Sequence, residues 1–238
     1  MANSTSITYR LKRKILTFTN KISRRLSKPD RKFTADMVYG ILASRSCLLT
    51  DISDQLHETV HKVNTVKRLS NHLSEGTPAS AAASYLHTVK RLVPSEPVVL
   101  IDESDIVKPD GKQFEALGIV RDGSESTHTK SVYKKGYHVT EACALTASNH
   151  PVSVFSRIHS SAEKDYKSVN TITFDAIRQA SALFGKATFV MDRGYDDNKI
   201  FLTLDHLKQD YVIRLKSDVY KRQLLDSVPP EVNTISFS

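Results

Sequence analysis

The sequence predicts an α/β protein in which an N-terminal helical domain, residues 1–96, precedes a mixed five-stranded sheet with helices, residues 97–217. Three observations predict this organisation. Apolar residues in the first part recur at intervals of three and four, the period of an amphipathic helix. After residue 97, short β-branched runs alternate with helical stretches. The charge also differs: residues 1–95 hold 16 Lys or Arg and 6 Asp or Glu, whereas the remainder holds 18 and 20.

Composition excludes several classes of protein. The 238 residues are 39% hydrophobic and 25% charged, which is typical of a globular chain with one or two cores. No apolar run approaches the ~20 residues of a membrane-spanning helix, and the N-terminus lacks the apolar stretch of a signal peptide. Cys47 and Cys143 have no metal-type spacing, and the nine histidines form no zinc pattern. We therefore expect a reduced, cytoplasmic protein with no membrane partner.

The first 32 residues predict a basic amphipathic helix. Lysines and arginines, Arg24 and Arg25 among them, surround apolar residues at helical spacing, and we expect the helix to end near Pro29. The apolar positions are Leu11, Ile15, Phe18, Ile22 and Leu26. Such a helix favours contact with the DNA backbone, because Lys and Arg neutralise phosphates. The alternative is a helix that only solubilises the surface of the domain.

Residues 33–73 continue the helical pattern and predict three further helices, a set that fits a helix-turn-helix-like module. The last of their apolar stripes runs through Leu56, Val60, Val63, Val66 and Leu69. Any small helical bundle would show the same pattern. A short helix over residues 81–92 and then Pro94 and Pro97 predict the domain boundary.

The second part predicts strands and helices in a fixed order. The expected elements are a strand at 98–101, an extended piece at 114–120, strands at 138–146 and 152–158, a helix at 171–184, a strand at 187–191, a helix at 197–207 and a strand at 211–215. This order resembles the ribonuclease H-like fold, in which three antiparallel strands precede two parallel strands with crossover helices. That resemblance implies that the strands at 98–101 and 187–191 are central neighbours.

Both of these strands stop on an aspartate, Asp102 and Asp192. Two adjacent carboxylates repel each other unless a cation lies between them, and Mg²⁺ prefers oxygen ligands. Such ions activate the attacking oxygen and stabilise the leaving one in displacement at phosphorus. The alternative is that each aspartate only caps a turn. Asp105 is the main rival for the first position, whereas Glu103 would point to the opposite face if the strand continues.

Basic residues near these strands are candidate DNA contacts. Arg193 follows Asp192 directly and could bind a phosphate or hold a carboxylate in place. Lys130, Lys134 and Lys135 lie among tyrosines and could line a DNA groove, although a solvated loop has the same composition.

Three stretches resemble the DDE transposases of bacterial insertion sequences, in the branch marked by a Y-R-E-K signature. They are Ile-Asp-Glu-Ser-Asp-Ile at 101–106, Gly-Tyr-His-Val-Thr at 136–140 and Met-Asp-Arg-Gly-Tyr-Asp at 191–196. The resemblance implies metal-dependent cleavage and strand transfer with three acidic residues and Mg²⁺ or Mn²⁺. Asp102 matches the first acid and Asp192 the second. It also implies double-stranded DNA as the partner, both transposon ends and target, with the N-terminal domain binding the ends and a homodimer in the synaptic complex.

The third acid of that family, a glutamate after the last strand, has no assigned match. Glu231 is the only glutamate after residue 215, and no Tyr or Arg precedes it at the expected spacing, so we do not assign it. Residues 218–223 read as the translation of GATGTGTATAAGAGACAG, the mosaic end used to prepare sequencing libraries. We therefore expect residues 218–238 to be a non-native tail and the truncated chain to be inactive or nearly so. Two alternatives stay open: a ribonuclease H-like nuclease without transposition, and a catalytically dead DNA-binding derivative of a transposase.

Overall fold

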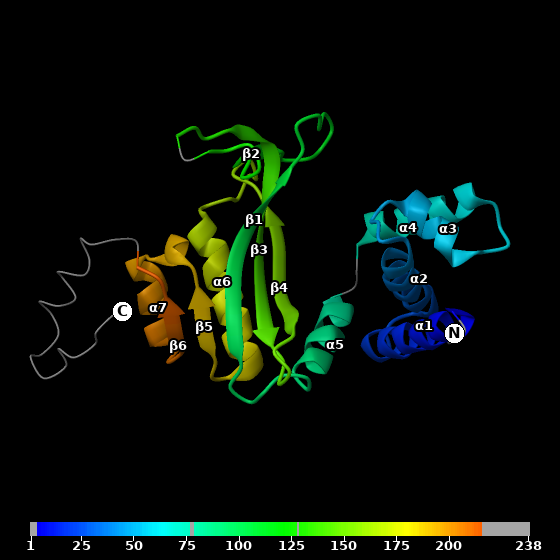
Figure 1. The fold of residues 1–238 in the computed structure, drawn as a ribbon, viewed down its shortest axis with the longest axis horizontal. Helices are drawn as coiled ribbons and strands as arrows, with labels where there is room; N and C mark the ends of the chain where they lie inside the picture. Colours follow the sequence, from blue (N-terminus) through cyan, green and yellow to red (C-terminus); the bar gives the residue numbers. More distant parts are fainter. Residues whose placement is uncertain (1–3, 77–78, 128, 216–238) are drawn as a thin grey trace, which may run out of the picture. The chain divides into compact units, whose positions relative to one another are not determined.

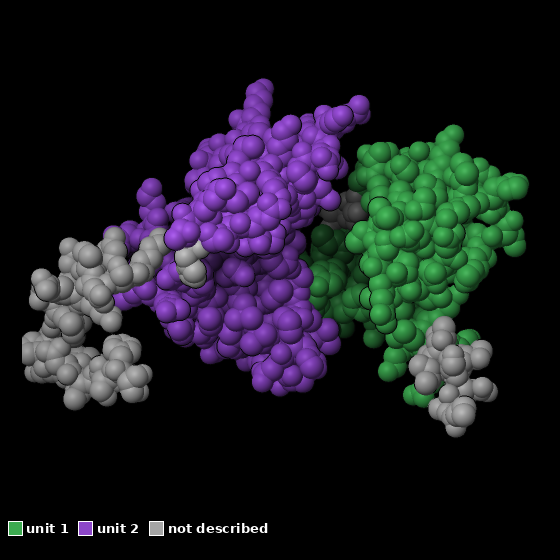
Figure 2. Space-filling view, turned by 45° about the horizontal axis from the view of Figure 1, so that its top comes forward, with its two compact units in different colours: residues 1–91 green, residues 92–238 purple. Residues whose placement is uncertain are grey.

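The computed structural model describes residues 4–76, 79–127 and 129–215, and the expected tail at 218–238 lies outside these ranges. The chain divides into two compact units, residues 1–91 and 92–238 (Figure 2). The division falls five residues before the boundary expected from the prolines. Among the described helices, none combines the length and the apolar character needed to cross a membrane.

The first unit is helical, as expected. A small core of Phe33, Ile52 and Leu69 joins its second, third and fourth helices, and Met37, Ile41, Leu49 and Leu56 pack against that core. Helix α1 contacts both α2 and α5. The helices are α1 (Ser4–Ile22), α2 (Lys28–Ser44), α3 (Leu49–Leu56), α4 (Lys62–Glu75) and α5 (Ala79–Val89) (Figure 1).

Pro29 begins a helix instead of ending one, which corrects the expected end of the first helix. Helix α1 stops at Ile22, and α2 begins at Lys28 with Pro29 in its first turn. The Ser27 side chain caps α2 by accepting a hydrogen bond from the backbone N–H of Asp30. Proline fits the first turn because the N–H that it lacks has no partner inside the helix there.

The apolar stripe expected to continue through Val60 and Val63 is interrupted. Residues 57–61 form the connection between α3 and α4, and His57 adopts a left-handed conformation at the end of α3. Val63 is 74% exposed and Val60 is also exposed, whereas Leu69 is fully buried. The helical spacing of Val60 and Val63 was therefore coincidental.

The second unit is built on a six-stranded sheet (Figure 1). Five strands follow the order β2-β3-β1-β5-β6, and β4 also pairs with β3, along its residues 138–145, beyond the part at 133–136 that pairs with β2. The sheet has one strand more than expected, because the extended piece near residue 118 pairs with the beginning of β3. The strands are β1 (Val98–Val107), β2 (Gly118–Arg121), β3 (Tyr133–Leu145), β4 (Pro151–His159), β5 (Thr188–Met191) and β6 (Asp210–Ile213).

The topology confirms the ribonuclease H-like order. Strands β1, β3 and β4 are joined by antiparallel pairing, and β5 and β6 add in parallel on the other side of β1. The first strand and the β5 strand are therefore central neighbours, as the sequence order implied.

Two helices connect the parallel strands. Helix α6 (Val169–Phe184) joins β4 to β5, and α7 (Asn198–His206) joins β5 to β6. Side chains of Ser168 and Asp197 cap their N-termini, and Gly185 follows α6 with a positive φ of 83°. Helix α6 packs on β1, β3 and β4 and touches α7 (Figure 1).

One face of the sheet is covered by these helices and the other is not. Val99, Ile101 and Phe189 lie on the covered face and are buried. On the other face, Leu100 is 36% exposed and Val212 is 61% exposed, with no described element covering them. Because side chains alternate along a strand, Asp102 lies on the same face as Leu100, and Glu103 lies on the face of Ile101.

Candidate active site at the ends of β1 and β5

Asp102 and Asp192 lie side by side at one end of the central strand pair. In the parallel register of β1 and β5, Leu100 is beside Val190 and Ile101 is beside Met191. The next residues along the two strands are Asp102 and Asp192, and both are exposed. Since neighbouring residues in a parallel register point to the same side of the sheet, both carboxylates belong to the uncovered face.

Local hydrogen bonds fix one oxygen of each carboxylate. Asp102 Oδ1 accepts from the backbone N–H of Glu103 at 2.9 Å. Asp192 Oδ1 accepts from the N–H of Gly194 at 2.7 Å, in the tight turn that leaves β5. A Cβ added at Gly194 would lie 2.8 Å from that Oδ1, so a larger residue would displace the carboxylate. The other oxygen of each aspartate has no hydrogen bond within the described ranges.

A third acidic residue shares this face. Glu141 of β3 is the antiparallel partner of Asp102, and directly opposite side chains in such a pair lie about 4.5–5.5 Å apart at Cβ. Its Oε1 accepts a weak hydrogen bond from Cys143 Sγ at 3.8 Å. Burial, and then the nearby Glu141 charge, raise the pKa of the Cys143 thiol. Glu141 is not predicted from the sequence as a site residue, because nothing in the sequence indicates the register of β3 against β1.

The covered face holds a different cluster, made of Glu103, Asp105 and His138. Strand β1 continues to Val107, so Glu103 does point away from the side of Asp102, as expected. Asp105 lies on the same side as Glu103 and opposite His138 in the register. Both carboxylates lie 2.8 Å from His138 Nδ1. The rival position Asp105 is therefore directed away from Asp192, toward His138.

Electrostatics around this cluster reflect partial burial. Desolvation raises the pKa of Glu103. The His138 imidazole lowers this pKa, whereas the charges of Asp105 and Asp102 raise it further. Tyr195 follows Asp192 in the chain, and burial together with the charges of Glu103, Asp102 and Asp192 raises the pKa of its phenol. Its ring is therefore close to the negative charges of both faces.

The residues expected to contact DNA fall into two groups. Arg24 and Arg25 are exposed in the turn after α1, and Lys130, Lys135 and Arg193 are also exposed. Lys134 differs from these five, because its ammonium pairs with Asp122 Oδ2 at 2.9 Å and with Glu125 Oε1. The hydrogen bonds to Glu125 and Asp122 raise the pKa of Lys134. Hydrogen bonds from the Ser124 hydroxyl and then from Lys134 lower the pKa of Asp122 to about 2. The structure therefore argues against Lys134 as a phosphate contact.

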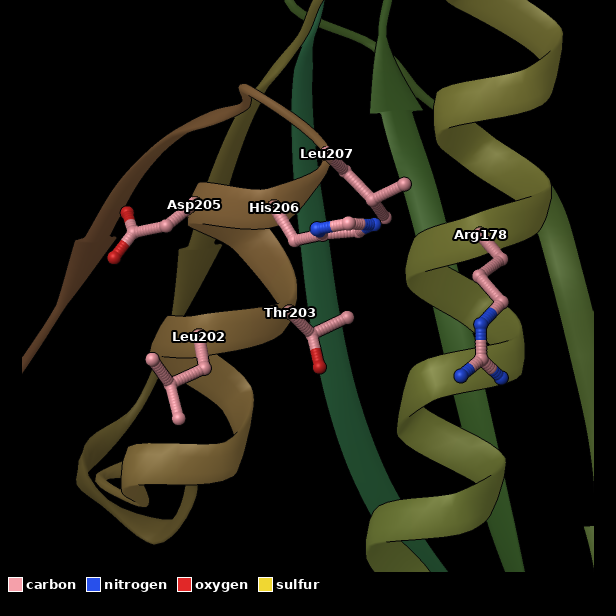
Figure 3. Close-up of a pocket in the computed structure, with 6 residues that line it drawn as sticks. All are labelled: Arg178, Leu202, Thr203, Asp205, His206 and Leu207. Carbon is pink, nitrogen blue, oxygen red and sulfur yellow. The ribbon is translucent and has the colours of Figure 1, made fainter.

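A shallow depression between α6 and α7 lies apart from the carboxylates. Figure 3 shows Arg178 of α6 facing Thr203 and His206 of α7 across it. The other lining residues are Leu202, Asp205 and Leu207. None of the acidic residues discussed above contributes to it.

Comparisons with known proteins place the second unit in a family. The family model described as "Transposase DDE domain" matches residues 94–234. No curated protein matches the chain. A solved structure of the Mos1 mariner paired-end complex with Mn is 14% identical, covering 80% of this chain and 70% of that chain with a TM-score of 0.29. A pre-cleavage Mos1 transpososome is also 14% identical, covering 84% of this chain and 66% of that chain with a TM-score of 0.30.

Proposed function

The chain belongs to the transposase DDE domain family and is a DDE-type transposase, and we propose that Asp102 and Asp192 carry its chemistry. The observation that supports this assignment is the β1–β5 register, in which Ile101 and Met191, the residues just before the two aspartates, are partners. Both are exposed on the uncovered face, so a phosphate backbone can approach them.

Transposases of this type use divalent metal ions, and the two aspartates fit such an ion. Hard cations such as Mg²⁺ take oxygen ligands, often one or two carboxylates together with substrate phosphate oxygens. No Lys, Arg or His of the described ranges forms an ion pair with Asp102 or Asp192, so neither charge is already neutralised. When bound, the ions activate the attacking oxygen and stabilise the leaving oxygen at phosphorus. We propose Mg²⁺ as the ion, with Mn²⁺ as a substitute.

The chain's own residues position the DNA. Arg193 is exposed directly beside Asp192 and can bind a phosphate near the scissile bond. Lys130 and Lys135, also exposed, extend the basic contacts on this unit. In the helical unit, Arg24 and Arg25 supply phosphate contacts for binding of the transposon ends.

The finer features of the proposal follow from the resemblance to transposases of insertion sequences. The substrate is double-stranded DNA, first the ends of the element and then a target, and two copies of the chain hold the ends in a synaptic complex. The element belongs to the Y-R-E-K branch of bacterial insertion sequences, and the protein acts in the cytoplasm. No described residue is assigned as the third acid, because the register supplies Glu141 but the family pattern places a glutamate after the last strand.

A cleavage assay tests the assignment. The substrate is a supercoiled plasmid that carries the genomic DNA flanking this gene, incubated with Mg²⁺ or Mn²⁺ and with protein expressed from the genomic reading frame itself, so that the expected non-native tail does not limit activity. We expect nicks and strand-transfer products, both lost in Asp102→Asn and in Asp192→Asn, with DNA affinity retained in each. Nicking without strand transfer would instead support the nuclease. Binding without any nicking, unchanged in the two variants, would support the catalytically dead derivative.

A further inference from the structure

We propose that Glu103, Asp105 and His138 form a second cation site, for a divalent transition metal, on the face of the sheet opposite Asp102 and Asp192. The carboxylate oxygens of Glu103 and Asp105 each lie 2.8 Å from His138 Nδ1. The three ligand atoms all lie within 4.8 Å of one another, and no other such group of three occurs in the described part of the chain. The inference does not depend on the proposed function.

Backbone pairing holds the three side chains in place. Glu103 and Asp105 are two residues apart on β1 and therefore share a face. His138 of β3 is the direct register partner of Asp105, within an antiparallel pairing that runs without irregularity from Val99 to Val107. Ligands that project from two paired strands lose little freedom on binding, so the site is organised before the metal arrives.

A second buried nitrogen without a partner lies beside the cluster. His159 is fully buried and stacks on His138 at 5.6 Å between ring centroids, and its Nδ1 has no hydrogen bond among the described residues. Its Nε2 lies 2.9 Å from Thr140 Oγ1. Buried polar atoms are nearly always hydrogen-bonded to protein or to ordered solvent and ions, so the orphaned Nδ1 atoms of these two stacked rings indicate a missing ligand.

His138 itself is the clearest of these orphans. Its Nδ1 is buried and lies beside two carboxylate oxygens, yet the directions do not meet the geometry of a hydrogen bond. A metal ion accepts the Nδ1 lone pair and both carboxylates together, whereas a proton on Nδ1 can point at only one oxygen well.

The ligand set selects the class of metal. One imidazole and two carboxylates with open positions suit Zn²⁺, Mn²⁺, Fe²⁺ or Co²⁺, whereas Mg²⁺ is rarely bound by imidazole. A cation here would join β1 to β3 one residue beyond Asp102 and would support the strand that carries it.

The experiment uses Co²⁺, whose visible absorption reports binding and nitrogen ligation. The starting protein is the full chain carrying Asp102→Asn and Asp192→Asn, which empties the site of the proposed function. We expect this protein to bind one Co²⁺, with competition by Zn²⁺ but not by equal concentrations of Mg²⁺. Added His138→Ala should abolish binding, and added His150→Ala, which changes an exposed turn histidine, should leave the affinity unchanged.

Two further variants guard against loss of folding. Asp105→Asn keeps the shape of the ligand and should weaken Co²⁺ binding, while the circular dichroism spectrum stays that of the starting protein. Glu103→Gln makes the same change at the other carboxylate and should weaken binding by at least about 10-fold. The proposal is overturned if the starting protein binds no Co²⁺, or if His138→Ala and Asp105→Asn bind it as tightly as the starting protein does. In that case the cluster is an ion pair only.

Discussion

Ile101 of β1 and Met191 of β5 are register partners at the centre of the sheet, and both are buried. This pairing fixes the relative position of the residues that follow them, Asp102 and Asp192. A slip of one residue would move one aspartate to the other face and separate the two carboxylates. The buried apolar partners therefore set the geometry of the proposed active site, because they fix which residues of the two strands lie side by side.

The two faces of β1 predict different results for Asp102→Asn and Asp105→Asn. We expect Asp102→Asn to lower the rate of plasmid cleavage by at least about 100-fold, since loss even of an outer partner of a metal costs about 10- to 100-fold. Asp105 points to His138 on the opposite face, so Asp105→Asn should change the rate by less than about tenfold. Cleavage rates at saturating Mg²⁺ measure both. The reverse order of effects would make Asp105 the first catalytic acid.

Lys134 and Lys135 offer a matched pair for DNA binding. Lys135 is exposed, so Lys135→Gln should reduce the slope of log affinity against log salt concentration by about 1, the loss of one phosphate contact. Lys134 is held by Asp122 and Glu125, so Lys134→Gln should leave the slope unchanged. Fluorescence anisotropy with a labelled duplex over a range of salt concentrations gives both slopes. Equal slopes for the two variants would show that neither, or both, contact DNA.

Lys134→Gln should instead lower the melting temperature, because it leaves the buried Asp122 carboxylate without its cation. That loss should be largest near neutral pH. The pKa of Asp122 is held at about 2, below its usual 3.8, so this carboxylate's contribution to stability is present above its usual pKa and disappears as the pH falls toward 2.

An ion-pair network in the helical unit predicts a similar pH dependence for Glu58. Its carboxylate accepts from Lys32, Thr65 and Arg68, and these contacts lower its pKa to about 2 from the usual 4.5. A group whose pKa is lower in the folded state stabilises the fold above its usual pKa and stops doing so as the pH falls through the folded value. Glu58→Gln should therefore lower the melting temperature at neutral pH. The difference in melting temperature between the two proteins should shrink as the pH falls from 4.5 to about 2. Calorimetry of both proteins across that range checks this, and a difference that does not vary with pH would contradict it.

The sequence predicted those elements whose signals are local. The helix expected at 171–184 corresponds to α6, which begins two residues earlier at Val169 and ends at Phe184 as expected, with Gly185 after it. Strands β1 and β5 are recognisable as apolar runs. Residues 102–105 are polar, so the sequence does not indicate that β1 continues beyond Ile101. Pairing with β3 keeps that continuation extended, and pairing cannot be read from one strand alone. Pro29 and Val63 led to wrong predictions because a local signal was ambiguous. Proline can begin a helix as well as follow one, and Val63 has helical spacing but is exposed.

The candidate site shows the same division. Asp102 and Asp192 were found because each ends an apolar run and the order of elements implied that the two strands are neighbours. His138 and Glu141 were not found, although His138 contacts Asp105 and Glu141 faces Asp102. Both belong to β3, and only the register across more than thirty residues of chain brings them to β1. Alternation along one strand indicates which side chains share a face, but it does not identify the partner residue on a strand so far away in the chain.

The close approach of α2 to α3 predicts that Gly40→Ala destabilises the helical unit. A Cβ at Gly40 would clash with Cγ2 of Ile52, which is fully buried and β-branched and therefore has little freedom to move. Alanine favours a helix over glycine by about 1 kcal/mol, but overpacking a core costs about 1–3 kcal/mol, so the net change should lower the free energy of unfolding. Urea unfolding measures it, with Gly123→Ala as the control, because a Cβ there meets nothing within 4 Å. If Gly40→Ala instead raised the free energy of unfolding, α2 and α3 would have to lie further apart than the clash with Ile52 implies.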